Sequence, residues 1–172
     1  DTLPDLLVCN DFAHGADQIW MNQGEGVFQQ LSNLAMRQSS WSSMAADVAD
    51  INRDGHDDFF IVEMLSRKHS RRQTQRANYE TGIEEPSIAM GLNRPQTQRN
   101  TLFLNRGDGS YAEIARMAGL DATEWSWGTV FMDVDLDGWD DVLVANGNNH
   151  DLLDGDATIA AMVAMRSVPK NR

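Results

Sequence analysis

The stretch DVDLDGWDDVLVA at residues 133–145 has a counterpart in DINRDGHDDFFIV at residues 50–62. Each stretch places side-chain oxygens at positions one, three, five and nine and a glycine at position six, and then continues into an apolar run. A glycine at which the chain turns sharply lets alternate side chains point inward. Each stretch therefore predicts an acidic loop that leads into a buried strand.

The composition of these loops favours a bound cation. Ca²⁺ takes about six to eight oxygen ligands, and carboxylates this close repel one another when no cation is present. An EF-hand would need a glutamate at position twelve, where this chain has Ile61 and Val144, so we expect strand–loop–strand sites. A pair of solvated acidic turns is the alternative, because Asp and Gly are common turn residues. The expected Ca²⁺ ligands, including the backbone carbonyl of the residue after each glycine, are Asp50, Asn52, Asp54, His56 and Asp58 in one loop and Asp133, Asp135, Asp137, Trp139 and Asp141 in the other.

A hairpin pattern also occurs twice, as IWMNQGEGVF at residues 19–28 and LFLNRGDGSY at residues 102–111. Each is typical of two strands joined by a tight glycine-containing turn. The hairpins and the acidic loops have the same offset along the chain, so one module of loop, strand and hairpin is repeated. An incomplete copy of the module lies at the start of the chain, where Asp5 corresponds to the last aspartate of an acidic loop.

Residues 64–99 interrupt the repeat, and the alternation of apolar and polar residues is lost there. We expect a short helix near residues 66–78, then loop, projecting from the sheet as an excursion. The insert is basic, and two interpretations fit it. It is either a solvated loop or a surface that contacts an anion or an acidic partner. A second helix is predicted over residues 156–165, with Asp156 as its N-cap.

These motifs resemble the FG-GAP, or VCBS, repeat of integrin α-subunit propellers and of many secreted bacterial proteins. The stretches SWG at 126–128, FMD at 131–133 and VANG at 144–147 are similar to repeats of the cartilage acidic protein and ASPIC/UnbV group. The resemblance implies an all-β fold of β-propeller blades, each a four-stranded antiparallel sheet with a calcium loop between its first two strands. Propellers have about four to eight blades, so the chain is expected to be an incomplete propeller whose remaining blades come from other sequence. The expected division of this one domain, residues 1–172, is blade copies at about 1–32, 42–115 and 126–148, a helical or loop insert at 64–99 and a C-terminal helical segment at 150–168.

The net charge of −12 argues against nucleic-acid binding, in which a basic face dominates the affinity. The sequence also predicts no transmembrane segment in this chain. Millimolar Ca²⁺ outside the cytosol suits carboxylate sites of modest affinity. Calcium and the resemblance together favour an extracellular, periplasmic or cell-surface location.

Two classes of function fit these features. The first is a non-catalytic binding or scaffold module that presents loops to a protein or glycan partner, with Ca²⁺ as its only cofactor. The alternative is the propeller portion of a larger extracellular enzyme, such as a lyase or a dehydrogenase. An enzyme should bring His, Lys or Arg residues together where strands face the central channel. The sequence shows no such set, so we expect a binding module that is not an enzyme, and the identity of its partner stays open.

Overall fold

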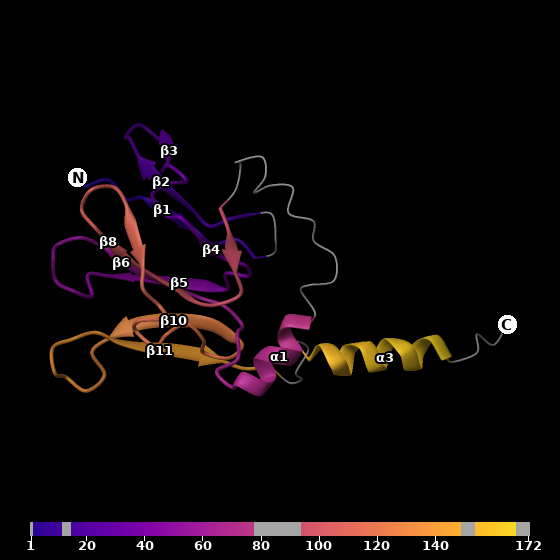
Figure 1. Ribbon diagram of the computed structural model, residues 1–172. Coiled ribbons are helices and arrows are strands. Elements are labelled where there is room, and N and C mark those ends of the chain that lie inside the picture. The colour runs from indigo at the N-terminus through magenta and orange to yellow at the C-terminus, as the bar shows by residue number, and fades with distance from the viewer. Residues whose placement is uncertain (1, 12–14, 78–93, 149–153, 168–172) are drawn as a thin grey trace.

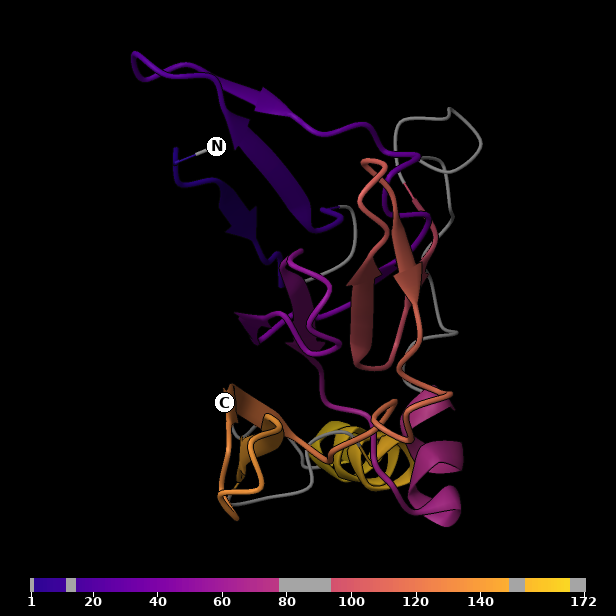
Figure 2. The same cartoon turned by 90° about the vertical axis from the view of Figure 1, so that its left-hand side faces the viewer.

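The computed structural model describes residues 2–11, 15–77, 94–148 and 154–167, and this part of the chain is mostly β-structure. Three antiparallel sheets stand one above another in chain order, and the helices lie at one end of them (Figures 1 and 2). The strands are β1 (Leu6–Val8), β2 (Gln18–Asn22), β3 (Phe28–Gln30), β4 (Ser39–Ser40), β5 (Ala45–Ala49), β6 (Asp58–Val62), β7 (Gln96–Thr97), β8 (Thr101–Asn105), β9 (Tyr111–Glu113), β10 (Ser126–Met132) and β11 (Asp141–Asn146), and the helices are α1 (His69–Ala77) and α3 (Gly155–Ser167).

The three sheets differ in strand number. The N-terminal sheet has the order β1-β2-β3, the central sheet has four strands in the order β5-β6-β8-β9, and β10 and β11 form a two-stranded hairpin. Each of these pairings is antiparallel, and each acidic loop joins two neighbouring strands, β5 to β6 or β10 to β11. The described residues form no closed ring of sheets.

Strand β6 takes part in both hydrophobic cores that the described residues form. Phe59 and Ile61 pack with side chains of the N-terminal sheet, whereas Phe60 and Val62 pack toward the β10–β11 hairpin, where Phe131 meets them. These four side chains of β6 are at most 4% exposed. Because side chains alternate between the two faces of a strand, this burial requires a neighbour on each face of the central sheet.

The two described ends of the insert contact the rest of the fold, so the expectation of a projecting excursion is wrong for these ends. Helix α1 lies inside the expected range of 66–78, and the residues before it, Met64, Leu65 and Ser66, are buried. Strand β7 pairs in parallel with β4, a pairing that the sequence pattern did not predict because both strands are two residues long. Residues 78–93 lie outside the described part of the chain.

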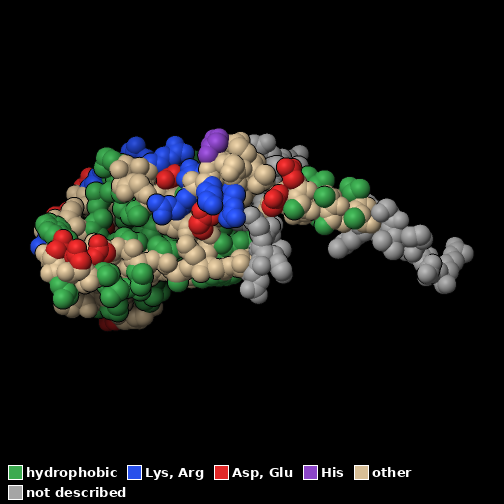
Figure 3. Space-filling model, turned by 90° about the horizontal axis from the view of Figure 1, so that it is seen from below, with side chains coloured by type: hydrophobic (Ala, Val, Ile, Leu, Met, Phe, Trp, Pro, Cys, Tyr) green, Lys and Arg blue, Asp and Glu red, His purple; other side chains and the backbone are tan. Residues whose placement is uncertain are grey.

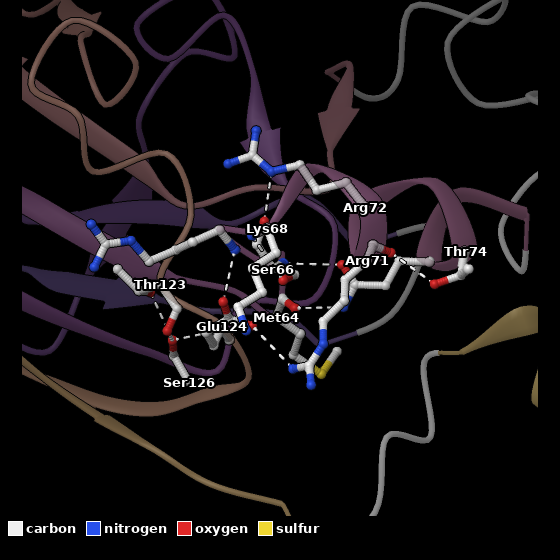
Figure 4. A network of polar contacts seen from close by, with 11 residues as sticks. Met64, Ser66, Lys68, Arg71, Arg72, Thr74, Thr123, Glu124 and Ser126 are labelled. Carbon is white, nitrogen blue, oxygen red and sulfur yellow. Dashed lines mark hydrogen bonds and ion pairs between the residues drawn. The ribbon is translucent and has the colours of Figure 1, made fainter.

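A polar network fastens α1 to the loop that precedes β10 (Figure 4). Glu124 accepts a hydrogen bond from the Arg67 backbone N–H at 3.0 Å and lies 4.0 Å from the Arg71 guanidinium. On the same segment, the Arg72 Nε donates to the Ser66 carbonyl at 2.6 Å. The Arg71 and Arg72 side chains leave the helix in different directions, Arg71 toward Glu124 and Arg72 toward the Ser66 carbonyl (Figure 4).

Helix α3 falls within the expected segment 150–168 and extends away from the sheets (Figure 1). Its N-cap is Asp154, whose carboxylate accepts a hydrogen bond from the Ala157 N–H at 3.1 Å. The predicted cap, Asp156, lies instead in the first turn, where its negative charge favours the positive end of the helix dipole.

Candidate metal centre

The second acidic loop, residues 133–141, joins β10 to β11. Carboxylate oxygens of Asp133, Asp135 and Asp141 all lie within 4.8 Å of one another, and they are the one such group of His, Cys, Asp or Glu side chains in the described part of the chain. Ca–O bonds are about 2.3–2.6 Å long, so two ligands on opposite sides of one ion lie about 5 Å apart. The spacing of these three carboxylates therefore fits a single Ca²⁺.

Five hydrogen bonds from backbone N–H groups orient the carboxylates of this loop. Leu136 and Gly138 have φ angles of 63° and 90°, in the left-handed region, so the loop turns tightly. This turn aims successive N–H groups at the aspartates. The donors and acceptors are Asp137 N to Asp133 Oδ1 (3.0 Å) and to Asp135 Oδ1 (3.1 Å), Gly138 N to Asp133 Oδ2 (2.8 Å), Trp139 N to Asp137 Oδ1 (2.8 Å) and Val134 N to Asp141 Oδ2 (3.1 Å).

The first loop, residues 50–58, repeats all five hydrogen bonds at equivalent positions. Its left-handed residues are Arg53 and Gly55, with φ angles of 61° and 86°. Two loops that differ at positions two, three, four and seven thus share one backbone, so the spacing of the acidic residues and the glycine determines the conformation. The equivalent bonds are Asp54 N to Asp50 Oδ1 (3.0 Å) and to Asn52 Oδ1 (3.1 Å), Gly55 N to Asp50 Oδ2 (2.8 Å), His56 N to Asp54 Oδ1 (2.9 Å) and Ile51 N to Asp58 Oδ2 (3.2 Å).

The first loop differs from the second in the side chain at position three. Asn52 stands where the second loop has Asp135, so the first loop has one carboxylate fewer. The Asn52 amide nitrogen donates a hydrogen bond to Asp54 Oδ2 at 2.9 Å. An amide therefore partly satisfies the Asp54 carboxylate, whereas the second loop has carboxylates at both equivalent positions.

The last aspartate of each loop also has different surroundings. Asp58 is fully buried, and its Oδ1 accepts a hydrogen bond from the Asn105 N–H of β8 at 2.8 Å. Asp141 is exposed, and within the described residues no third strand bonds to it. Burial raises the pKa of the Asp58 carboxyl, and the negative charges of two loop aspartates add to the rise, although two backbone hydrogen bonds oppose it. The first loop is therefore held by a third strand, and the second is not.

Asparagines in the hairpins connect them to the acidic loops, a role that the sequence interpretation missed. Asn105 Nδ2 donates to the Asp57 carbonyl at 3.3 Å, and its Oδ1 accepts from the Gly107 N–H at 3.0 Å. Asn22 makes the equivalent bonds in the N-terminal sheet, to the Pro4 carbonyl and from the Gly24 N–H. The repeated Asn-x-Gly in the two hairpin sequences was the signal for this role.

The incomplete copy at the start of the chain keeps the same contact between loop and hairpin. Asp5 Oδ1 accepts a hydrogen bond from the Asn22 N–H at 2.8 Å, just as Asp58 accepts from Asn105. Asp5 therefore occupies the place of the last loop aspartate, as its position in the sequence predicts.

The two residues expected to offer backbone carbonyls have distinct side-chain contacts. The Trp139 indole lies under the Arg53 guanidinium, with 3.9 Å from Arg53 Cζ to the ring centroid, so the side chains of the two loops touch. The His56 ring lies against the hairpin turn, where a Cβ at Gly107 would come within 2.6 Å of His56 Nε2. The roles of the His56 and Trp139 backbone carbonyls as metal ligands stay predictions.

A family model described as FG-GAP-like repeat matches residues 1–61 and 88–144, which is more than half of the chain. The gap in the match covers α1 and the middle of the insert. No curated protein and no solved structure matches the chain. Both acidic loops and both hairpins lie inside the matched residues, and the chain belongs to the FG-GAP-like repeat family.

Proposed function

We propose that the chain is a calcium-binding, non-catalytic binding module of the β-propeller type. The observation that carries this proposal is the pair of loops with one conformation, in which backbone N–H groups orient the side-chain oxygens. In the second loop three carboxylates also converge. The residues proposed to hold Ca²⁺ are Asp50, Asn52, Asp54, Asp58, Asp133, Asp135, Asp137 and Asp141 by their side chains, with His56 and Trp139 by their carbonyls.

In this proposal the cation stabilises the loops by offsetting the repulsion between their carboxylates. Each loop joins two adjacent strands, so a cation bound there also crosslinks those strands. Binding to the folded state alone raises the free energy of unfolding in proportion to the logarithm of calcium concentration above the Kd. Calcium would therefore act on the fold, and the chain's own surfaces would contact the partner.

Calorimetric titration with Ca²⁺ and with Mg²⁺ tests the metal sites. The expected result is two Ca²⁺ binding events, of which Asp135→Asn removes or weakens the tighter one. Asp140→Asn is the matched control, because it removes the same charge from the same loop at a position outside the proposed ligand set. Mg²⁺ binding of equal strength, or equal effects of the two variants, would contradict the proposal, because Mg²⁺ requires a tighter octahedral site.

The outer face of the β10–β11 hairpin supports the proposal that further sheets complete a propeller. Val130, Met132 and Leu143 are 46%, 42% and 56% exposed there, although the inner face of the same hairpin packs on the central sheet. Figure 3 shows hydrophobic side chains gathered on this side of the molecule. An apolar sheet face of this kind is typical of a surface that another sheet covers.

We further propose that the module works outside the cytosol, in an extracellular, periplasmic or cell-surface protein, and that its partner is a protein or a glycan. FG-GAP-like repeats are typical of such proteins, and the net charge of −12 disfavours nucleic acid. None of the described helices is long and apolar enough to span a membrane. The similarity to the ASPIC/UnbV group stays a prediction.

A further inference from the structure

The insert helps to form a hollow of about 410 Å³ between α1, β7 and the segment that follows β9. A volume of this size lies in the range of about 300–1,000 Å³ that small-molecule sites occupy. Trp41 lines the hollow, and its backbone N–H donates to the Thr97 carbonyl at 3.0 Å, which attaches this wall to the insert. None of the lining residues belongs to an acidic loop.

The lining of this hollow is basic although the chain as a whole is acidic. Among the described residues, three arginines line it, Arg72, Arg99 and Arg116, against one carboxylate, Asp121, and Arg99 also pairs with Glu113 beside the hollow. The net charge of the chain is −12, so the charge of these lining residues is opposite in sign to that of the chain as a whole. A local excess of guanidinium groups in a concave site favours an anionic ligand.

Contacts to neighbouring residues hold two of the guanidinium groups in place. Arg99 donates to Glu113 Oε2 at 2.8 Å, and both side chains are 11% exposed. The Arg72 Nε donates to the Ser66 carbonyl, and its Nη1 lies 3.5 Å from Asp121 Oδ2 (Figure 4 shows the Arg72 side chain). These arginines have little conformational freedom to lose when a ligand binds.

The third guanidinium group is available to a ligand. Arg116 is exposed, and within the described residues it has no acidic partner. A guanidinium group can donate two parallel hydrogen bonds to a carboxylate, which gives a strong and directional contact.

The other lining groups indicate a sugar rather than a bare anion. Gln98 and Thr97 add amide and hydroxyl groups that can hydrogen-bond to sugar hydroxyls, and Trp41 adds an aromatic surface against which a sugar ring can pack. We propose that this hollow binds an acidic sugar unit of the uronic acid type, whose carboxylate pairs with Arg116. This assignment deepens the proposed function, on which it rests, by naming a glycan class and giving the basic insert a role.

Nuclear magnetic resonance titration with a matched pair of sugars tests the proposal. The probes are methyl β-D-glucuronide and methyl β-D-glucoside, which differ only in the carboxylate, and sodium acetate serves as a carboxylate without a sugar. The expected result is saturable shifts of Arg116, Gln98 and neighbouring amides with the glucuronide, and at least about tenfold weaker binding of the glucoside and of acetate. The affinity should also fall as salt concentration rises.

Two variants and one control separate this site from nonspecific attraction. Arg116→Gln should weaken glucuronide binding at least about tenfold, and Gln98→Glu should weaken it through charge repulsion. Arg37→Gln is the control, because Arg37 is an exposed arginine outside the hollow, and it should leave the affinity unchanged. Folding of each variant is checked in the same spectra by the dispersion of the β-sheet amides.

Four results would overturn the proposal: no saturable binding of the glucuronide, equal binding of the glucoside, equal binding of acetate, or a loss in Arg37→Gln as large as in Arg116→Gln. Calcium binding is measured on the same sample through the amide signals of Gly55 and Gly138, which donate to loop aspartates. A sample that shows the calcium shifts but no glucuronide shifts would refute the sugar site alone. A sample without calcium shifts would refute the metal proposal, whatever the sugar result.

Discussion

The loops at residues 50–58 and 133–141 have one backbone conformation and two different environments. Their five internal hydrogen bonds agree in length within 0.1 Å. The first loop belongs to the four-stranded sheet, where β8 bonds to its last aspartate, and it carries an asparagine at position three. The second has a carboxylate at that position and belongs to a two-stranded hairpin.

The comparison of the two loops separates what sets the loop conformation from what sets the need for a cation. A short-range pattern of aspartates and glycine sets the loop conformation, because it is the same in both environments. The number of carboxylates and the contact to a third strand set how strongly each loop needs a cation. We therefore expect the first loop to keep its shape without calcium, and the second to bind calcium more tightly and to depend on it more.

Replacement of the last loop aspartate should give the largest difference between the loops. In the absence of calcium, Asp58→Ala leaves the partly buried N–H groups of Ile51 and Asn105 without an acceptor, and this should lower the free energy of unfolding by about 4 kcal/mol. Asp141→Ala should cost less than about 1 kcal/mol, because the residue is exposed. Urea unfolding in the presence of EDTA measures both values. Equal losses would show that β8 does not stabilise the first loop.

Glu63, directly after β6, should produce a pH dependence that has no counterpart in the second repeat. Glu63 is buried at the end of β6, and burial raises the pKa of its carboxyl to about 7 from 4.5, with three backbone hydrogen bonds opposing the rise. Its equivalent after the second loop is Asn146, which does not titrate. Between these two pKa values the unfolded chain loses the proton that the folded chain keeps, so stability should fall as pH rises from 4.5 to 7.

The expected loss from Glu63 is about 3 kcal/mol, at about 1.4 kcal/mol per pKa unit, and it is complete above pH 7. Glu63→Gln should remove this part of the pH dependence. The measurement is urea unfolding with EDTA at several pH values, taken as the difference between wild type and variant so that other carboxylates cancel. A difference that does not change with pH would mean that the pKa of Glu63 is the same in the folded and the unfolded chain.

An exchange of the position-three residues should reverse the order of calcium affinity. Asn52→Asp gives the first loop the charge of the second and removes the amide bond to Asp54, so it should tighten calcium binding there about tenfold, or about 1.4 kcal/mol. Asp135→Asn should weaken the second loop by a similar factor. Calorimetry on the single and double variants measures both, with Asp57→Asn as the control for charge alone. Affinities that keep their order in the double variant would show that the surrounding sheet, and not the ligand charge, sets the affinity.

The sequence predicted the repeated elements well because their signals are local. The acidic loops, the strands that follow them and the two hairpins lie where alternation, Asn and Gly place them, and the family match covers them. Asp5 also occupies its expected place, since its contact to Asn22 depends on a residue only 17 positions away. Short-range patterns of this kind fix backbone conformation with little help from the rest of the fold.

Apart from helix α1, the sequence predicted the described part of the insert poorly, because its structure depends on distant partners. The pairing of β7 with β4 joins residues more than fifty positions apart and has no hydrophobic pattern. The Arg72 side chain, which looked like part of a solvated basic stretch, is held by Ser66 and Asp121. The hollow that it lines could not be seen in the sequence, because Trp41, Gln98 and Arg116 come from three separate segments.

The smallest expected effect concerns the contact between the two loops. Arg53 lies over the Trp139 ring at 3.9 Å, and a cation–π contact at an exposed site contributes about 0.5–1 kcal/mol. Arg53→Leu should therefore lower the free energy of unfolding by about that amount. Leucine is a suitable replacement because Leu136 occupies the equivalent left-handed position in the second loop, with a φ angle of 63°.

A double-mutant cycle isolates this contact from the two side chains themselves. Arg53→Leu, Trp139→Leu and the double variant are compared by urea unfolding, and a coupling free energy of about 0.5–1 kcal/mol is expected. Arg53→Lys keeps the charge but not the planar group, so it should retain only part of the coupling. The same cycle repeated with saturating calcium shows whether the loops respond to the cation separately. If the coupling is zero in both conditions, the two loops are independent sites, and their different affinities follow from ligand charge and sheet support alone.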